Sequence, residues 1–226
     1  MKLNILPLAK FLFIIFSSLT LSQDKINKPA AIAEEVKDSS KKIDIKAQED
    51  FMRDLMSITA FAPEPPTAKQ IKLMKLFKES VIEKIKNKKV DLNYKHKQLG
   101  EDTAMHIVAQ FGDKELTELV FSQKGLKLNS VNLSNETPLF KAVVGKNLIA
   151  VKILVKEKAV DFNIQENLSG RTAFLEVLFL GNKDIMTEFF ANLARIDFDL
   201  KDNRGNSART ILGKELMEDV KKDLKK

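Results

Sequence analysis

The sequence contains no cysteine, no tryptophan and a single tyrosine among its 226 residues, and it has only two histidines. Without cysteine the chain has neither a disulfide framework nor thiol chemistry. His96 and His106 lie ten residues apart with no cysteine beside them, so they do not make a recognisable zinc site. A phosphate-binding loop, a nucleophile elbow and a paired-carboxylate motif are also missing. We therefore expect no catalytic activity, no cofactor and no metal.

The charge of the chain is basic but mixed. There are 38 Lys and Arg residues against 31 Asp and Glu residues, a formal net charge of +7. Lysines crowd residues 84–97, and such a basic edge would attract phosphates or an acidic protein. No nucleic-acid module is recognisable, however, and tyrosine and tryptophan are scarce. We interpret the lysines as a solvated surface and expect neither a nucleic-acid partner nor a small-molecule substrate.

A short phrase recurs four times in the second half of the chain. The copies are Gly100–His106, Asn135–Phe140, Gly170–Leu175 and Gly205–Thr210. Their hydroxyl residues, Thr103, Thr137, Thr172 and Ser207, are separated by 34, 35 and 35 residues. Phrases that end in Asn or Asp close the units at residues 90–93, 126–129, 160–163 and 196–199. A period of this length predicts a stacked solenoid.

The repeated phrase resembles the ankyrin repeat, whose pattern is Gly-x-Thr-Pro-Leu-His-x-Ala, a glycine turn between two helices, and a closing Ala-Asp-Val-Asn. The resemblance covers residues 70–226, although only Pro138 keeps the family proline, only His106 keeps the histidine, and Lys146 stands where the turn glycine is expected. It implies an all-α, ankyrin-type helical repeat solenoid with hairpin-like loops. It also implies that His106 ties adjacent loops together and that the module is non-enzymatic and binds proteins.

Helix physics supports the same pattern. Thr and Ser are good N-cap residues, and Pro138 suits the first helical position, where its missing N–H is harmless. We expect Gly112, Gly145 and Gly181 to end their helices in left-handed turns. Terminal repeats need a more polar outer side. Two apolar stripes fit such caps: Ile71, Met74, Phe77, Val81 and Ile85 at the N-terminal end, and Leu212, Leu216 and Val220 at the C-terminal end.

Residues 1–22 have the layout of a secretory signal peptide. Two lysines precede an apolar run from Phe11 to Leu21, and Ser22 stands before a polar segment. The run is shorter than the roughly 20 apolar residues of a membrane span. We expect cleavage near Ser22 and export to the periplasm or the medium. The alternative is an uncleaved membrane anchor at residues 3–21. The composition is rich in Lys, Asn, Ile and Phe, which is typical of proteins from bacteria with AT-rich genomes, so we expect a bacterial source.

Residues 23–66 are predicted to be a flexible tether before a repeat domain at residues 67–226. The first part of the tether buries too little apolar surface to fold alone. A short amphipathic helix fits residues 46–60, where the apolar residues at helical spacing are Phe51, Met52, Leu55 and Met56. We favour a helix folded back onto the N-terminal cap; the alternative is a helix that binds a partner or a membrane surface.

The resemblance places partner binding on the inner helices and on the tips of the hairpin-like loops. The inner-helix positions that the family leaves variable are Gln110, Phe111, Val144, Gly145, Phe179 and Leu180. Their apolar members would form an exposed stripe, which marks an interaction site; the alternative is that the helices have slipped and these residues are core. The loop residues expected to bind are Tyr94, Lys95, Lys97, Glu166 and Arg204. The alternative is that these loops are solvated and have no partner.

These observations favour an exported, monomeric, non-enzymatic ankyrin-repeat protein that binds a partner protein through its inner helices and loop tips. A membrane enters this interpretation only if the leader is not cleaved. The alternative is a membrane-tethered accessory of the cell envelope that stabilises a membrane or enzyme complex.

Overall fold

The computed structural model describes residues 44–59 and 67–213. Every described residue belongs to one compact unit, residues 43–226. The predictions that lie outside the described residues are the leader (1–22), the anchor (3–21), most of the tether, and the cap residues Leu216 and Val220.

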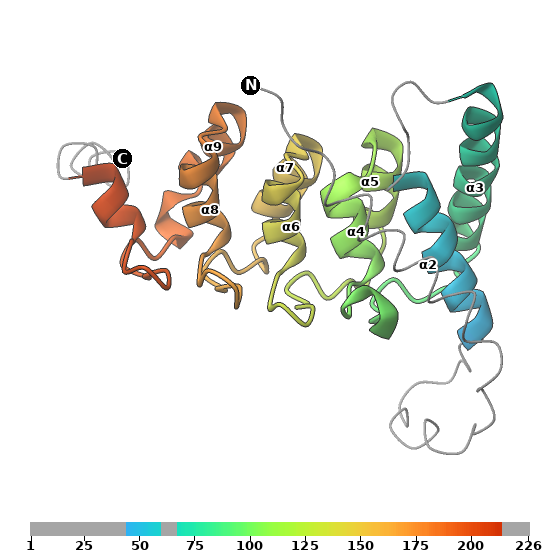
Figure 1. Cartoon of the computed structure of the whole chain (residues 1–226), viewed down its shortest axis with the longest axis horizontal. Helices are drawn as coiled ribbons and strands as arrows, with labels where there is room; N and C mark the ends of the chain where they lie inside the picture. Colours follow the sequence, from blue (N-terminus) through green and yellow to red (C-terminus); the bar gives the residue numbers. More distant parts are fainter. Residues whose placement is uncertain (1–43, 60–66, 214–226) are drawn as a thin grey trace, which may run out of the picture. The chain divides into compact units, whose positions relative to one another are not determined.

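The described helices form pairs that stack side by side (Figure 1). The pairs are α2 (Ile45–Thr59) with α3 (Ala68–Lys86), α4 (Ala104–Phe111) with α5 (Lys114–Phe121), α6 (Pro138–Val144) with α7 (Leu148–Lys156), and α8 (Ala173–Leu180) with α9 (Lys183–Phe190). Two short 3₁₀ helices, η2 (Lys97–Leu99) and η3 (Leu193–Arg195), and a last helical segment at residues 208–213 complete them. No strand occurs in the described residues, only isolated bridges. The predicted all-α helical repeat solenoid is confirmed.

The repeated hydroxyl residues begin the first helix of each pair, which we call the inner helix (α4, α6 and α8). The Thr137 hydroxyl accepts a hydrogen bond of 3.1 Å from the N–H of Phe140, and Thr172 accepts one of 3.1 Å from Leu175. Pro138 occupies the first turn of α6, as predicted. The N-cap interpretation is therefore correct for Thr137, Thr172 and Ser207, whose hydroxyl accepts from the N–H of Thr210 at 3.2 Å. The Thr103 hydroxyl bonds to His106 Nδ1 instead.

The turn glycines differ from the prediction. Gly181 is left-handed at φ 64°, but Gly112 and Gly145 have φ of −66° and −73°. In the second repeat it is Lys146 that takes a positive φ, of 54°. A Cβ on Gly145 would collide with the backbone of Gln110 in the preceding inner helix. The left-handed prediction is wrong for Gly112 and Gly145, and glycine at 145 serves the close approach of α4 and α6.

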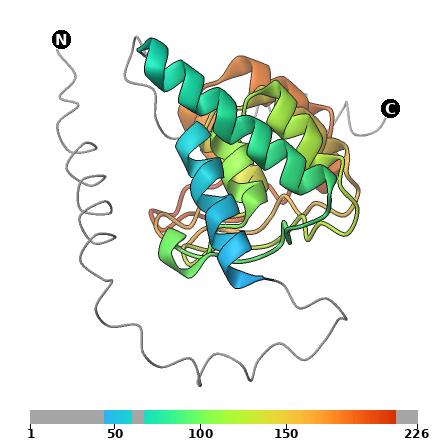
Figure 2. The same cartoon turned by 90° about the vertical axis from the view of Figure 1, so that its right-hand side faces the viewer.

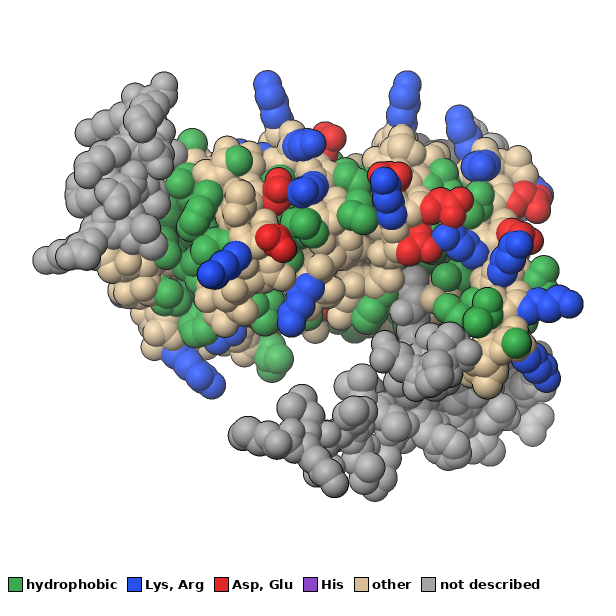
Figure 3. Space-filling view, turned by 90° about the horizontal axis from the view of Figure 1, so that it is seen from above, with side chains coloured by type: hydrophobic (Ala, Val, Ile, Leu, Met, Phe, Trp, Pro, Cys, Tyr) green, Lys and Arg blue, Asp and Glu red, His purple; other side chains and the backbone are tan. Residues whose placement is uncertain are grey.

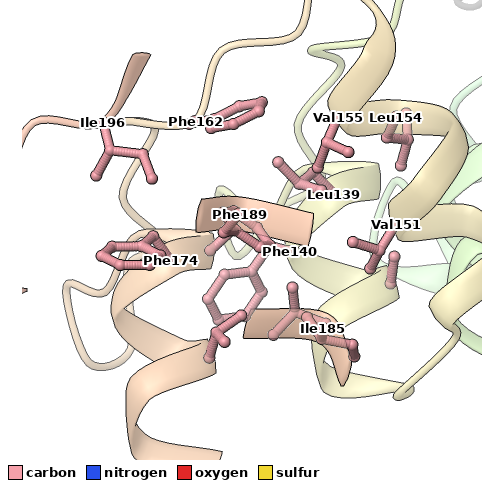
Figure 4. Packing of buried hydrophobic residues seen from close by; sticks show 14 of the residues in the cluster. Leu139, Phe140, Val151, Leu154, Val155, Phe162, Phe174, Ile185, Phe189 and Ile196 are labelled. Carbon is pink, nitrogen blue, oxygen red and sulfur yellow. The ribbon is translucent and has the colours of Figure 1, made fainter. Parts of the chain in front are cut away.

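Apolar side chains fill the space between consecutive pairs (Figure 4). The ring centroid of Phe189 lies 5.4 Å from that of Phe162 and 5.7 Å from that of Phe174, and all three side chains are buried. Phe162 belongs to the closing phrase of one repeat, whereas Phe174 and Phe189 belong to the next pair of helices. The aromatic contact therefore joins one repeat to the next.

Helix α2 belongs to the folded unit and packs against α3 and α4 (Figure 2). It buries Phe51, Met52 and Leu55 completely. The side-chain amide of Gln48 exchanges two hydrogen bonds of 2.9 Å with the backbone of Asp91. The helix predicted at residues 46–60 is therefore folded back onto α3, as favoured. The folded unit begins before residue 67, which the sequence pattern gave as the start of the repeat domain.

Helix α3 buries apolar side chains mainly in its second half. Val81 and Ile85 are buried, Met74 and Phe77 are half-buried, and Ile71 is exposed. The predicted stripe is therefore covered only where α2 and the first ankyrin-like pair reach it. Although α3 is 19 residues long, no described helix combines the length and the apolarity needed to cross a membrane.

Candidate functional site

Apolar side chains remain exposed at the ends of the inner helices. Phe111, Val144, Phe179 and Leu180 are 46%, 38%, 45% and 39% exposed. They lie seven or eight residues after the capping hydroxyl on α4, α6 and α8, which pack against each other in that order. We call these four residues the inner-helix face. The alternative that they are core residues is wrong, because the helix register leaves them at the surface.

Phe111 forms part of the wall of a groove of about 320 Å³ between α2, α3 and α5. The rim of the groove is charged, since the ammonium of Lys78 lies 2.6 Å from the Asp113 carboxylate and 2.8 Å from that of Glu115. Partial burial opposes the charge of Lys78, but hydrogen bonds and attraction from both carboxylates outweigh it and raise its pKa. The other apolar wall residues are Ile58, Met74 and Leu116.

Arg171 covers one side of the Phe179 ring. Its guanidinium carbon lies 3.6 Å from the ring centroid, a cation–π contact. The guanidinium is fixed in turn, because Nη1 lies 2.9 Å from the Glu176 carboxylate and Nε lies 3.7 Å from that of Asp202. Phe179 is therefore held in one orientation while its other side stays exposed.

The preceding repeat carries the same ion pair with the charges exchanged. Glu136 and Arg171 each lie one residue before a capping threonine, and Lys141 and Glu176 each lie four residues after it. The Lys141 ammonium is 3.4 Å from the Glu136 carboxylate and 3.6 Å from that of Asp102. Opposite charges thus occupy equivalent positions beside the inner-helix face.

His106 connects two consecutive loops. Its Nδ1 accepts hydrogen bonds from the N–H and the hydroxyl of Thr103, at 3.1 and 2.9 Å. The proton is therefore on Nε2, which donates to the backbone carbonyl of Glu136 at 3.0 Å. Burial lowers the pKa of His106, even though the nearby Asp102 carboxylate and the Glu136 carbonyl oppose this effect. The expected role of this histidine as a tie between loops is confirmed.

The asparagines of the closing phrases form a ladder between repeats. Asn93, Asn129 and Asn163 each donate through Nδ2 to a carbonyl of the next repeat and accept through Oδ1 from one of its N–H groups. All six distances are between 2.7 and 3.0 Å. At the fourth position Asp199 has no amide to donate, and its carboxylate pairs with Arg209. The ladder fixes the spacing of the units from residue 93 to residue 197.

Capped inner helices and the asparagine ladder recur with the period of the repeated phrase, and a family model recognises part of this pattern. The model for ankyrin repeats matches residues 73–166 with three copies. Residues 73–166 are thus similar to ankyrin repeats. The ankyrin repeat is a non-enzymatic module that generally mediates protein–protein interaction. Helices α8 and α9 lie beyond the match but continue the capping pattern and the ladder of the ankyrin repeats.

No match is found among curated proteins. Within residues 44–59 and 67–213 no group of three or more His, Cys, Asp and Glu side chains could hold a metal ion.

The loops before the ankyrin inner helices, called fingers below, have rigid tips. They comprise residues 94–102, 130–136, 164–171 and 200–206. Asn132 Oδ1 accepts hydrogen bonds from two backbone N–H groups of its own finger, at 2.9 and 3.0 Å, and Asp202 Oδ1 does the same at 2.8 and 2.9 Å. The residue two positions before each cap has a positive φ: Glu101, Asn135, Gly170 and Gly205.

Glu166 performs this turn-holding role in the third finger and is not a binding residue. It is only 5% exposed, and its carboxylate accepts hydrogen bonds from the N–H groups of Leu168, Ser169 and Arg171. Burial opposes its charge, but these N–H groups and the Ser169 hydroxyl outweigh burial and lower the pKa of Glu166. The prediction that Glu166 faces a partner is therefore wrong, because the finger itself uses the carboxylate.

The remaining predicted residues keep some access to solvent. Lys95 is exposed but lies 3.2 Å from the Glu101 carboxylate, and Lys97 and Arg204 are exposed on the first and fourth fingers. Tyr94 and Gln110 are only half-buried. The first finger therefore presents its lysines more fully than its tyrosine.

Sequence reasoning missed two leucines on the middle fingers. Leu133 is 64% exposed and Leu168 is 89% exposed. The signal was present in the sequence, since Asn-Leu-Ser occurs at residues 132–134 and again at 167–169. Only the structure shows that both leucines lie at finger tips.

Proposed function

We propose that this protein is an exported ankyrin-repeat protein that binds a partner protein through the inner-helix face. The observation that carries the proposal is the exposure of four apolar side chains at repeating positions of three consecutive inner helices. Ordered helices that leave apolar side chains in water at recurring positions mark an interaction surface.

Phe179 is the anchor of this face. Arg171 holds the ring by the cation–π contact, so binding would cost little further ordering of the side chain. Aromatic residues and their Arg neighbours often dominate the energetics of protein interfaces. Leu180 extends the apolar surface beside the ring, and the Arg171–Glu176 pair supplies a polar edge. The surface suits an apolar segment of a partner that is flanked by polar residues.

Export is the second part of the proposal and depends on residues 1–22. N-terminal sequencing of the protein purified from its natural source should find Gln23 at or near the start of the chain. A chain that begins at Met1 would contradict cleavage and would favour the anchor at residues 3–21.

Affinity capture with matched variants tests the binding proposal. Three proteins serve as bait: the wild type, the variant Phe179→Asp and the control variant Leu76→Asp. The control changes an exposed leucine on α3. Phe179→Asp should reduce recovery of the partner by about tenfold or more, because it places a charge in the apolar centre of the interface. The control should recover the partner as the wild type does.

Circular dichroism should give wild-type helical spectra for both variants, because both side chains are exposed. Equal recovery of every bound protein by Phe179→Asp, Leu76→Asp and the wild type would contradict the inner-helix face as the binding surface.

A further inference from the structure

The four fingers separate their charges by depth. The exposed basic residues of the fingers are Lys95 and Lys97 on the first and Lys201 and Arg204 on the fourth. Their acidic residues are all buried or half-buried: Glu101, Asp102, Glu136, Glu166 and Asp202. The carboxylates hold turns or pair with basic groups, as Glu166 and Glu136 do. The outermost layer of the fingers is therefore positively charged.

The two middle fingers add an apolar side chain to this layer. Leu133 and Leu168 occupy the same position of their fingers, four residues before the capping threonine, and both point into solvent. Lys97 lies on the finger before them and Arg204 on the finger after them. The order along the fingers is thus basic, apolar, apolar, basic.

Backbone hydrogen bonds tie the four tips together. The N–H of Leu133 donates to the carbonyl of Gly100 at 2.8 Å, and the N–H of Asn167 donates to that of Ser134 at 2.9 Å. The N–H of Asn203 continues the series to the carbonyl of Ser169, at 2.8 Å. Figure 1 shows the fingers projecting along one edge of the stacked helices. The tips form one ordered surface, which we call the finger-tip row and define as Lys97, Leu133, Leu168 and Arg204.

We propose that the finger-tip row lies against an anionic membrane surface, as a second binding surface distinct from the inner-helix face. Leu133 and Leu168 insert between lipid chains, and Lys97 and Arg204 contact phosphate headgroups. An anionic membrane has negatively charged headgroups at its surface and apolar acyl chains beneath them. The basic side chains would contact the headgroups, and the isolated leucines would reach the acyl chains. The rigid turns present the leucines without further ordering.

The immediate surroundings of the leucines favour a lipid surface over a protein. Asn132 and Ser134 flank Leu133, and Asn167 and Ser169 flank Leu168, so neither leucine belongs to a continuous apolar patch. A partner protein would need a separate apolar pocket for each leucine. The acyl chains of a membrane need no such pockets, because they surround an apolar side chain at any lateral position.

The opposite end of the helices lacks this arrangement. Figure 3 views that end, and Asp and Glu side chains are exposed there among the Lys and Arg side chains. Lys78, for example, shares this region with Asp113 and Glu115. On the fingers, by contrast, every carboxylate is buried or half-buried, whereas the lysines and the arginine of the first and fourth fingers are exposed.

The absence of tryptophan from the chain allows a site-specific test. The full chain with Leu168→Trp is mixed with vesicles of phosphatidylcholine and phosphatidylserine. A second protein with Phe190→Trp, at an exposed residue of α9, is the control. The fluorescence of tryptophan at 168 should shift to the blue and be quenched by brominated lipid chains, whereas that at 190 should not. No quenching at 168, or equal quenching at both positions, would overturn the proposal.

Vesicle sedimentation then measures the contribution of the tips. The double variant Leu133→Ser, Leu168→Ser should bind the same vesicles about tenfold or more weakly than the wild type, because two leucine side chains no longer leave water. Phe190→Ser, at an exposed residue of α9, is the control, and all proteins carry the same leader. Wild-type binding should also fall with added salt and on vesicles of phosphatidylcholine alone. If the double variant binds as the wild type does, the fingers do not meet the membrane, and a protein partner for the tips becomes the better explanation.

Discussion

Arg171 lies over the ring of Phe179 with its guanidinium carbon 3.6 Å from the ring centroid. Arg171 comes from the end of a finger and Phe179 from the end of an inner helix, so the contact joins the finger to the helix that follows it. One side chain of the pair is charged and largely buried, and the other is aromatic and half open to solvent. The contact couples the stability of the third repeat to the presentation of the anchor.

Substitution of Arg171 tests this coupling. Arg171→Ala should lower the free energy of unfolding by about 1–3 kcal/mol, because it removes the stack and leaves Glu176 and Asp202 without their cation. Urea unfolding measures the loss. Arg204→Ala, at an exposed arginine of the next finger, should change the stability by less than about 0.5 kcal/mol. Equal losses in the two variants would show that the contact has no special role.

The exchanged ion pairs predict a measurable coupling in the second repeat. Lys141→Glu alone should be destabilising, because it adds a third carboxylate beside Glu136 and Asp102. The double variant Glu136→Arg, Lys141→Glu recreates the arrangement that Arg171 and Glu176 have in the third repeat. It should recover at least about 1 kcal/mol of the loss in a double-mutant cycle. Strict additivity of the two substitutions would contradict the equivalence of the pairs.

His106 predicts a loss of stability at mildly acidic pH. In the unfolded chain a histidine has its ordinary pKa of 6.5, whereas burial lowers the pKa of His106 in the folded state. Below pH 6.5 the unfolded state therefore binds the proton first, and stability decreases as the pH falls toward the lowered pKa. The stability is fully present above pH 6.5.

Urea unfolding between about pH 7 and pH 5 measures this dependence, with a limit of about 1.4 kcal/mol per pH unit for one group. The slope should be smaller in His106→Gln. Burial lowers the pKa of His96 as well, so His96→Gln should remove a further part. An unchanged slope in both variants would show that the histidines do not cause the acid sensitivity.

The asparagine ladder predicts that a single amide joins two repeats. Asn129→Ala removes the hydrogen bonds to the Ala159 carbonyl, at 2.7 Å, and from the Asp161 N–H, at 2.8 Å. We expect a loss of about 1–2 kcal/mol in urea unfolding. Asn167→Ala, at an exposed finger position, is the control and should have a much smaller effect. A similar loss in both would mean that the ladder does not hold the repeats together.

The sequence predicted the features that follow from a fixed period. Thr137 and Thr172 cap helices because a hydroxyl at the start of an apolar run suits an N-cap, and Phe179 is exposed because its position relative to Thr172 sets its side of the helix. The signal peptide at residues 1–22 and the bacterial source were predicted from composition, and both remain predictions.

Other features depend on contacts between repeats, which a single sequence does not display. Glu166 looked like a free acid on a loop, but its own finger binds it through three N–H groups. Gly145 looked like a left-handed turn, but its backbone lies against Gln110 of the preceding helix. The ladder of Asn93, Asn129 and Asn163 joins residues that are at least 30 positions apart.

Photo-cross-linking from the inner-helix face tests the central claim most directly. A photoreactive phenylalanine analogue replaces Phe179 in one protein and Leu76 in another, and both are irradiated in the natural source of the protein. We predict that position 179 gives a discrete adduct with one partner protein and that position 76 does not. The same adducts from both positions, or none from 179, would contradict binding through the inner-helix face.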